Sequence, residues 1–368
     1  MTNPVVSIIT PTYNHERFIG ECIESVLGQT FPHWEMIIVD DESTDGTEAI
    51  VRRYDDPRVT YIRQAHVGPY RMAETYNRAL DRARGEFIAI LEGDDCWPSY
   101  RLELQLPYFS DHPGAVAAYG RAGTIDDRGN PLGFYPAPEL ASNVAATREF
   151  VLRRSWVQPV TVLIRHNALL KIGGFVQDAR LPIVDLPTWL RLSLDGPFQF
   201  QDAVLGLWRK HDRQVTANYT MSRGAHEISF DFYRGLPPEK KREIGITDAE
   251  LRQVQRVFLA EDGWSTALVE MNNRRWREAR RAARTTATNG SGFRRLEAAL
   301  ALGCSLLHVN PTLVISKVAA TAPGRRLLER HNPIARHQRP EQLVAMLSTD
   351  AGILKPVALR SIHGEAQS

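Results

Sequence analysis

The sequence predicts an α/β fold, in which a mostly parallel sheet is flanked by helices and followed by a mainly helical C-terminal region. Two patterns lead to this prediction. In the first part of the chain, short β-branched apolar runs alternate with segments whose apolar residues recur at helical spacing, and the connections are short. Beyond Pro237 and Pro238, helical patterns dominate. We therefore expect two domains, residues 1–235 and residues 236–368.

The individual elements follow from the same patterns. Strands are expected at residues 5–9, 36–39, 59–62 and 87–91, and helices at 18–27, 47–54 and 73–84. Pro11 is expected to stop the first strand because proline has no N–H to donate, and Gly85 to close the third helix. Later elements are strands at 115–119, 160–164 and 203–208, a turn at 173–174, a helix at 189–194 and a helical hairpin at 264–272 and 274–286.

Composition and charge narrow the class of protein. The net charge of +2 does not indicate a nucleic-acid-binding protein. Residues 1–235 carry 24 Lys and Arg against 30 Asp and Glu, whereas residues 236–368 carry 21 against 13, which suggests two modules with different partners. The three cysteines have no metal-ligand spacing, and their odd number argues against a disulfide framework. Because we find neither a secretory signal nor an apolar run of about 18 residues, we expect a cytoplasmic protein.

The segment from Ile88 to Asp95 suggests a metal site. A short apolar strand ends in three carboxylates within four positions, those of Glu92, Asp94 and Asp95. Such a cluster repels itself unless a cation neutralises it, and oxygen ligands favour a hard ion, Mg²⁺ or Mn²⁺. An ion of this kind usually takes a phosphate as a further ligand. The alternative is a strand-to-turn junction with solvated acids.

Polar residues also follow two of the other predicted strands. Residues 11–14 (Pro-Thr-Tyr-Asn) come after the first strand, and Asp40 and Asp41 end the second. Because the carboxyl ends of parallel strands meet at one edge of a sheet, these groups and the acid cluster are expected to form a single nucleotide site.

Five segments together resemble family 2 glycosyltransferases with the GT-A fold. They are residues 7–14, 25–30, 39–47, 84–86 and 91–95, and a looser likeness extends to about residue 215. The resemblance implies an inverting, metal-dependent transfer of a sugar from a nucleoside diphosphate sugar to an acceptor hydroxyl. It further implies a glycan or lipid-linked acceptor and a role in cell-surface polysaccharide or glycolipid biosynthesis.

The resemblance assigns the donor-binding residues. Pro11, Thr12, Tyr13 and Asn14 would line the base, with the ring of Tyr13 offering a face to it. Asp41 would accept the imide N–H of the base, which favours a UDP- or dTDP-sugar. Asp40 is a weaker candidate, because both acids also suit side chain–backbone bonds in a turn.

One departure from the family pattern lies in the predicted helix at 73–84. Tyr76 stands where the family often has arginine, and Asn77 matches the residue that follows it. Arg71 is close enough in sequence to serve as a phosphate or sugar contact instead.

The metal site also follows from the resemblance. Asp94 and Asp95 match the family's ion-binding acids, with Asp95 the first choice for direct ligation and Asp94 a further donor contact. Glu92, where aspartate is common, would reach the ion or the sugar hydroxyls. His211, in the basic segment 208–211 after the last strand, would be a metal or phosphate contact. A solvated basic strand end is the alternative for that segment.

Asp185 is the expected catalytic base. It matches the second acid of a family motif, and Val184 replaces the first. An apolar neighbour would raise the pKa of Asp185 by desolvation. The alternative, which does not exclude the first, is that Asp185 caps the following helix.

The basic stretch from Arg274 to Arg284 has two interpretations. It would be a peripheral anchor on anionic lipid at the inner face of the plasma membrane, which suits a lipid-linked acceptor. Alternatively, it is the solvated face of a helix that packs Trp276, Ala279 and Ala283 inward. For the whole chain, a nucleotidyltransferase-like enzyme and a catalytically inactive carbohydrate-binding relative stay open as alternatives.

Overall fold

The computed structural model describes residues 3–135, 137, 139–140, 142–153, 157–215, 222–308 and 340–349. The chain forms two compact units. The first comprises Met1–Phe150, Ser155–Tyr219 and His337–Ser368, and the second comprises Val151–Arg154 and Thr220–Arg336. The expected domain boundary at residue 235 lies inside the second unit, at the end of helix α10 (Ser222–Gly235).

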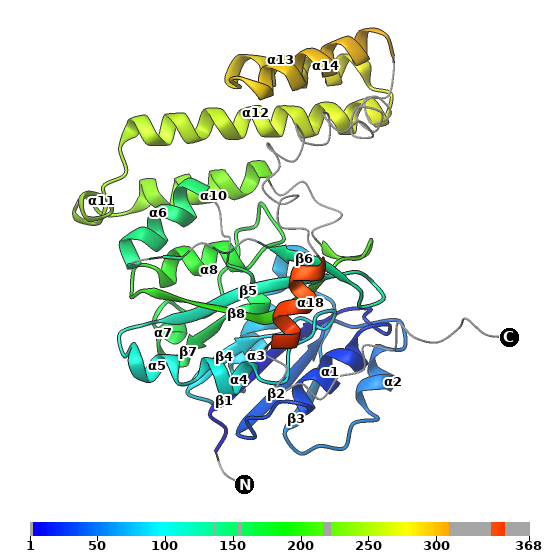
Figure 1. Ribbon diagram of the computed structural model, residues 1–368, viewed down its shortest axis with the longest axis vertical. Helices are drawn as coiled ribbons and strands as arrows, with labels where there is room; N and C mark the ends of the chain where they lie inside the picture. The colour runs from blue at the N-terminus through cyan, green and yellow to red at the C-terminus, as the bar shows by residue number, and fades with distance from the viewer. Residues whose placement is uncertain are drawn as a thin grey trace, which may run out of the picture. The chain divides into compact units, whose positions relative to one another are not determined.

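A sheet of eight strands forms the centre of the first unit (Figure 1). The strands are β1 (Val6–Thr12), β2 (Trp34–Asp40), β3 (Val59–Arg63), β4 (Phe87–Ile90), β5 (Ala117–Ile125), β6 (Pro131–Tyr135), β7 (Leu163–Arg165) and β8 (Phe198–Arg209). Their order is β3-β2-β1-β4-β7-β5-β6, with β8 paired to β5. The pairs among β1 to β4 are parallel, and so is the pair of β5 with β8. Strand β7 pairs antiparallel with β4 and with β5, and β6 pairs antiparallel with β5. The predicted α/β class with a mostly parallel sheet is therefore confirmed.

Helices of the first unit pack along this sheet. They are α1 (Ile19–Leu27), α2 (Thr47–Val51), α3 (Met72–Leu80), α4 (Arg101–Gln105), α5 (Tyr108–Asp111), α6 (Asn143–Arg153, which ends in the second unit), α7 (His166–Lys171), α8 (Asp185–Leu192) and α18 (Pro340–Thr349), with 3₁₀ turns η1 (Pro69–Arg71) and η2 (Pro159–Thr161). The apolar residues of α1 fall at helical spacing and are buried against the sheet, namely Ile19, Cys22, Ile23 and Val26. Helix α18 returns to the sheet and packs on β6 and β8 through the buried Leu343.

Pro11 does not stop the first strand, contrary to the prediction. β1 runs to Thr12, and Pro11 is aligned with Val39 of β2. The carbonyl of Pro11 accepts the N–H of Gly93, so the missing N–H of Pro11 also faces the side of β4. The paired part of β4 ends at Ile90, opposite Ile9, so Pro11 lies beyond it.

Two further predictions about element boundaries are wrong. Helix α3 ends at Leu80 rather than at Gly85. Gly85 instead lies against β1, where a Cβ would come within 2.6 Å of the backbone nitrogen of Ser7, so the close approach of the two backbones requires glycine. The predicted strand at 160–164 is a 3₁₀ turn followed by the short strand β7.

The second unit is helical. Its helices are α10, α11 (Pro238–Ile244), α12 (Asp248–Asn272), α13 (Trp276–Asn289) and α14 (Phe293–Leu306). The predicted hairpin is confirmed as α12 and α13, although α12 begins earlier than expected. Ala279 and Ala283 of α13 are fully buried against Ala267 and Met271 of α12, and Trp276 packs partly buried beside them. No helix in the described part of the chain is long and apolar enough to span a bilayer.

Candidate functional site

The carboxyl ends of β1, β2 and β4 meet at one edge of the sheet, as the sequence predicts. The N–H of Asp41 donates to the carbonyl of Thr12 (2.9 Å), and the N–H of Gly93 donates to that of Pro11 (3.1 Å). A Cβ on Gly93 would lie 2.6 Å from Thr12 Oγ1, so only glycine lets the acid cluster approach β1 this closely. The polar ends of the three strands thus form one continuous site.

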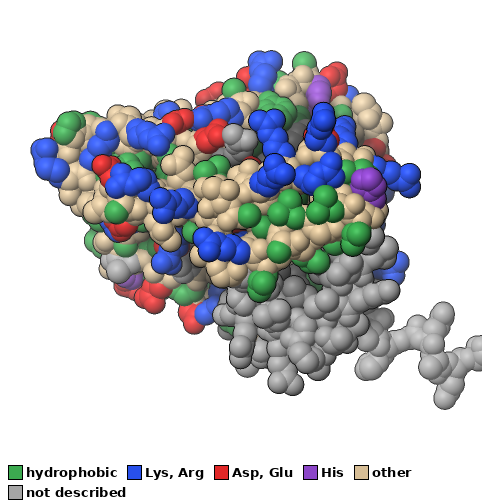
Figure 2. All heavy atoms as spheres, turned by 90° about the horizontal axis from the view of Figure 1, so that it is seen from above, with side chains coloured by type: hydrophobic (Ala, Val, Ile, Leu, Met, Phe, Trp, Pro, Cys, Tyr) green, Lys and Arg blue, Asp and Glu red, His purple; other side chains and the backbone are tan. Residues whose placement is uncertain are grey.

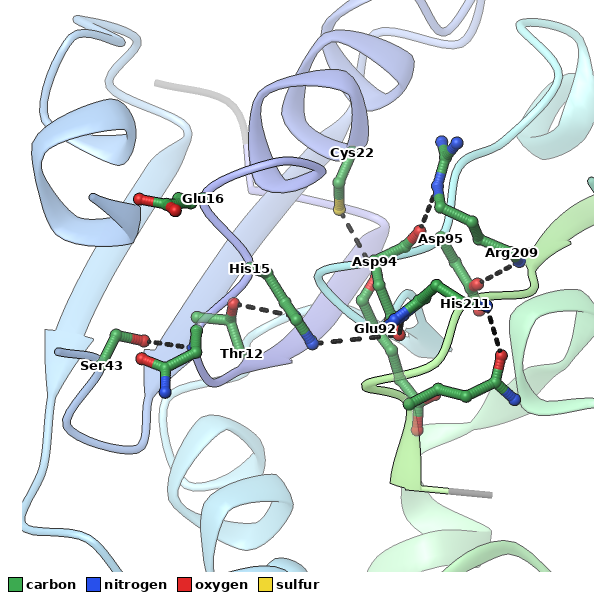
Figure 3. Close-up of polar contacts among 12 residues, drawn as sticks. Thr12, His15, Glu16, Cys22, Ser43, Glu92, Asp94, Asp95, Arg209 and His211 are labelled. Carbon is green, nitrogen blue, oxygen red and sulfur yellow. Dashed lines mark hydrogen bonds and ion pairs between the residues drawn. The ribbon is translucent and has the colours of Figure 1, made fainter. Parts of the chain in front are cut away.

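The acid cluster consists of Glu92, Asp94 and Asp95 (Figure 3). One oxygen from each carboxylate lies within 4.8 Å of the others, a donor set that fits a hard divalent ion such as Mg²⁺ or Mn²⁺. Burial and the charge of Asp94 raise the pKa of Glu92 to about 7, and the same two causes raise the pKa of Asp95 well above its ordinary value. The carboxylates therefore repel one another, and a shared cation would relieve that repulsion.

Two histidines face Asp94 of the acid cluster. Nε2 of His211 lies 3.0 Å and Nε2 of His15 lies 3.8 Å from Oδ2 of Asp94 (Figure 3). Burial alone would raise the pKa of Asp94, but the two imidazoles outweigh it and lower that pKa. His211 lies where the prediction needs it. Sequence reasoning missed His15, although its position directly after the 11–14 segment was a usable signal.

Arg209 anchors the end of β8 to the acid cluster. Its backbone N–H donates to Asp95 Oδ1 (2.9 Å), and its guanidinium donates to the carbonyl of Asp94 (2.8 Å) and to Glu21 (2.6 Å). The side chain is 1% exposed. Arg209 therefore fixes the end of β8 to the acid cluster and to Glu21. In the same basic segment, 208–211, the imidazole of His211 contacts the carboxylate of Asp94.

The carboxylate of Asp40 takes part in the turn after β2. It accepts the N–H of Ser43 (2.7 Å) and the hydroxyl of Tyr61 (2.6 Å), and it is fully buried. The amide oxygen of Asn14 accepts the N–H of Thr44 (2.8 Å), which ties the end of β1 to the same turn. These contacts favour the turn-stabilising role for Asp40 over direct contact with a nucleotide.

Asp41 lies at the bottom of a small polar nest. Its carboxylate accepts the N–H groups of Val67 (2.8 Å) and Gly68 (3.0 Å) and the side-chain amide of Gln64 (2.8 Å). Nδ1 of His66 lies 2.9 Å from Asp41 Oδ2 and 2.9 Å from the Asp41 carbonyl oxygen, and the His66 ring packs against Tyr13 with centroids 4.6 Å apart and planes tilted by 30°. The imidazole of His66 thus makes both contacts that were predicted for the base, a feature that the sequence did not reveal.

Asp185 is the first residue of α8, and Val184 holds the N-cap position without a side-chain hydrogen bond. Burial raises the pKa of Asp185, although hydrogen bonds from its own N–H and that of Leu186 oppose this. This upward shift of the Asp185 pKa has the direction that was expected from the apolar side chain of Val184. The charge of Asp185 also raises the pKa values of Glu92 and Tyr76.

Arg71, the last residue of η1, and two residues of α3 have partners within the protein. Arg71 is exposed and pairs with Glu74 through two hydrogen bonds of 2.6 and 2.8 Å. Asn77 binds the backbone of Phe175 on both sides, at 2.9 and 2.8 Å, and so fixes α3 to the turn at 173–174. The hydroxyl of Tyr76 donates to Oε1 of Glu92. The predicted role of Arg71 in donor binding stays a prediction.

The sequence matches known glycosyltransferases. The family model described as Glycosyl transferase family 2 matches residues 7–175. The putative teichuronic acid biosynthesis glycosyltransferase TuaG of Bacillus subtilis (strain 168) is 37% identical over 205 residues, which cover 53% of this chain and 75% of that protein.

Solved structures share the fold. The structure of S. aureus TarS 1-349 in complex with UDP-GlcNAc matches with a TM-score of 0.55 and 19% identity, covering 82% of this chain and 87% of that one. Mannosyltransferase PcManGT from Pyrobaculum calidifontis, in complex with GDP-Man and Mn²⁺, matches with a TM-score of 0.52 and 19% identity, covering 97% and 89%. At these identities the likeness concerns the fold, which is the GT-A fold. The match to TuaG over three quarters of its length, together with the family-model match, shows that the chain belongs to glycosyltransferase family 2.

Proposed function

We propose that this glycosyltransferase moves a sugar from a UDP- or dTDP-sugar to an acceptor hydroxyl with inversion at the anomeric carbon. The observation that carries the proposal is the arrangement at the sheet edge. Tyr13 and Asp41 follow β1 and β2, the acid cluster follows β4 beside them, and Asp185 begins α8, from where its charge acts on Glu92. A base, a diphosphate and a sugar can follow one another along such an edge.

Each group of residues has a chemical task in this reaction. Asp185 removes the proton from the acceptor hydroxyl, whose oxygen attacks the anomeric carbon from the side opposite the diphosphate. Asp94 and Asp95 hold Mg²⁺ or Mn²⁺, with His211 near them. When bound, the ion supplies Lewis-acid stabilisation of the diphosphate leaving group. The transition state has oxocarbenium character, so the departing diphosphate needs charge compensation more than a proton.

A screen of nucleotide sugars by thermal shift, with and without Mn²⁺, tests the donor. A donor that binds the native state raises its melting temperature, and we expect the largest rise with a uridine or thymidine diphosphate sugar in the presence of Mn²⁺. Analysis of the product anomer by NMR then tests inversion. A rise with guanosine diphosphate sugars alone, or a product that retains the donor configuration, would contradict the proposal.

His66→Ala is expected to tighten UDP binding by roughly two- to tenfold, because it removes the imidazole that lies against the Asp41 carboxylate and uncovers the ring of Tyr13. Isothermal titration with UDP and Mn²⁺ measures the change. His33→Ala, which removes an exposed histidine just before β2, is the matched control and should bind UDP as the wild type does. Weaker UDP binding by His66→Ala would show instead that the imidazole contributes to the base site.

The acceptor that we propose is a glycan or a lipid-linked saccharide of a cell-surface polymer. The name of the Bacillus relative, which refers to teichuronic acid biosynthesis, supports this class of acceptor. An assay that offers soluble oligosaccharides and polyprenyl-diphosphate saccharides side by side distinguishes the two kinds. Transfer to neither, by an enzyme that does bind a nucleotide sugar, would contradict this part of the proposal.

We further propose peripheral contact with anionic membrane, at the inner face of the plasma membrane, through α13. Arg277, Arg281 and Arg284 are exposed and recur at helical spacing, opposite the buried Ala279 and Ala283. Figure 2 shows many Lys and Arg side chains on the face that it draws, among hydrophobic ones. A row of cations of this kind is attracted to a surface of anionic lipid, by about 1 kcal/mol for each residue near it.

Replacing Arg277, Arg281 and Arg284 with glutamine should lower binding to anionic vesicles at least tenfold, because three attractive charges are lost. Flotation with vesicles of phosphatidylglycerol and phosphatidylcholine measures the bound fraction. The control removes three exposed arginines from the first unit: Arg53, Arg78 and Arg82. Equal loss in both variants would mean that net charge alone matters, and absence of wild-type binding would reject the membrane contact.

A further inference from the structure

Tyr76 is a buried tyrosine in the middle of the site. Its side chain is 2% exposed, and its ring lies 5.1 Å from that of Phe175, centroid to centroid. The neighbouring Asn77 fixes α3 to the backbone of Phe175 through two hydrogen bonds. The hydroxyl of Tyr76 is therefore held in place by its surroundings, and it donates to Oε1 of Glu92.

The Tyr76–Glu92 pair connects α3 to the acid cluster, to which Glu92 belongs. Helix α3 is also tied to α8, the helix that begins with Asp185, because Asn77 binds Phe175 and the N–H of Val176 donates to Thr188 Oγ1 (3.0 Å). The charges of Asp94 and Asp185 both raise the pKa of Tyr76, and both act in the same direction on Glu92. Asp94 marks the end that would hold the diphosphate, and Asp185 marks the end where the acceptor hydroxyl is deprotonated. In an in-line transfer the sugar lies between those ends, so its hydroxyls must meet the groups that lie there.

Glu92 has two oxygens and only one is engaged by Tyr76. A hydrogen bond from a phenol to a carboxylate is stronger than one between neutral groups, so it fixes the direction of the carboxylate. The second oxygen is then available to accept a hydrogen bond. A sugar hydroxyl is the donor that the reaction brings to this place.

We infer that Tyr76 is a positioning residue, which holds Glu92 as the hydrogen-bond acceptor for one hydroxyl of the transferred sugar. The inference rests on the proposed function and deepens it. It assigns to Glu92 recognition of the sugar, and it leaves Asp94 and Asp95 as the carboxylates that bind the ion. The donor class it requires is a nucleotide sugar with a free ring hydroxyl at that position.

The test compares the affinity for a nucleoside diphosphate with that for its sugar derivative. Isothermal titration in the presence of Mn²⁺ is done with UDP and with the UDP-sugar that gives the largest thermal shift, or with the dTDP pair if that is larger. Tyr76→Phe and Glu92→Gln are expected to weaken binding of the sugar nucleotide about tenfold, the loss typical of a hydrogen bond to a charged group, and to change binding of the bare diphosphate less than twofold. Tyr54→Phe is the matched control, since it removes a tyrosine hydroxyl that donates to Glu24, on α1.

Mn²⁺ binding to the same variants separates sugar recognition from metal ligation. Measured by electron paramagnetic resonance with UDP present, the Mn²⁺ affinity of Tyr76→Phe and Glu92→Gln should stay within twofold of the wild type, whereas Asp94→Asn should lose at least tenfold. Equal losses for UDP and the UDP-sugar, no loss for either, or a loss of Mn²⁺ affinity in Glu92→Gln comparable to that in Asp94→Asn would each overturn the inference. If the wild type binds no nucleotide sugar at all, the proposed function fails, and the inference fails with it.

Discussion

Asp185→Asn is expected to lower turnover by roughly 10²- to 10⁴-fold, the contribution typical of a general base, with affinity for the donor unchanged. Asparagine keeps the shape of aspartate and can still accept the N–H of Leu186, but it cannot take a proton. Single-turnover rates and donor titrations on the same preparation measure the two quantities. Asp195→Asn, which removes a carboxylate just beyond the end of α8, is the matched control. Wild-type turnover in Asp185→Asn would show that another group is the base.

The pH dependence of the wild type offers a second readout of the same assignment. The base acts in its ionised form, and burial raises the pKa of Asp185. Turnover should therefore fall on acidification at a pH above the ordinary aspartate value of about 3.9. A profile of kcat against pH that is flat down to that value would contradict this expectation.

The second large effect is expected from the double substitution Asp94→Asn and Asp95→Asn. It removes the two carboxylates that are expected to ligate the ion, so Mn²⁺ should no longer raise the melting temperature, and turnover should fall by about 10³-fold or more. Without metal the two substitutions should have opposite effects on the melting temperature: loss of the Asp95 charge relieves the burial and repulsion that raise its pKa, whereas loss of the Asp94 charge removes the favourable interaction with His15 and His211 that lowers the pKa of Asp94.

A matched control for this double variant is Asp126→Asn and Asp127→Asn, which changes an adjacent pair of aspartates in the turn between β5 and β6. A rise of the melting temperature with Mn²⁺ that survives in the Asp94 and Asp95 variant would show that the ion binds elsewhere.

Local sequence patterns predicted the strands and the acid cluster for a physical reason. Apolar runs such as residues 36–39 have few ways to be buried other than as strands of a covered sheet, and the three acids are neighbours along the chain. Convergence of the strand ends followed from the parallel order of β1, β2 and β4. The base assignment of Asp185, by contrast, depended on family resemblance, because position 185 is far in sequence from the rest of the site.

What the sequence did not reveal is mostly contact between distant segments. His66 reaches Asp41 and Tyr13 only because the chain after β3 turns back over the ends of β1 and β2. Arg209 belongs to the basic segment 208–211, yet its guanidinium donates hydrogen bonds to Glu21 and to the Asp94 carbonyl. The Tyr76–Glu92 hydrogen bond likewise joins two residues that depart from the family pattern. Neither residue alone predicts this pairing, because the two lie in different elements.

The claim on which the account depends is that the acid cluster and a nucleoside diphosphate share one divalent ion. A crystal structure with Mn²⁺ and UDP, with the metal located by its anomalous signal, tests this most directly. We expect a single strong peak bridging the carboxylates of Asp94 and Asp95 and the diphosphate, with uracil near Tyr13 and Asp41. A bound UDP whose diphosphate lies away from these acids, with no manganese between them, would contradict the account.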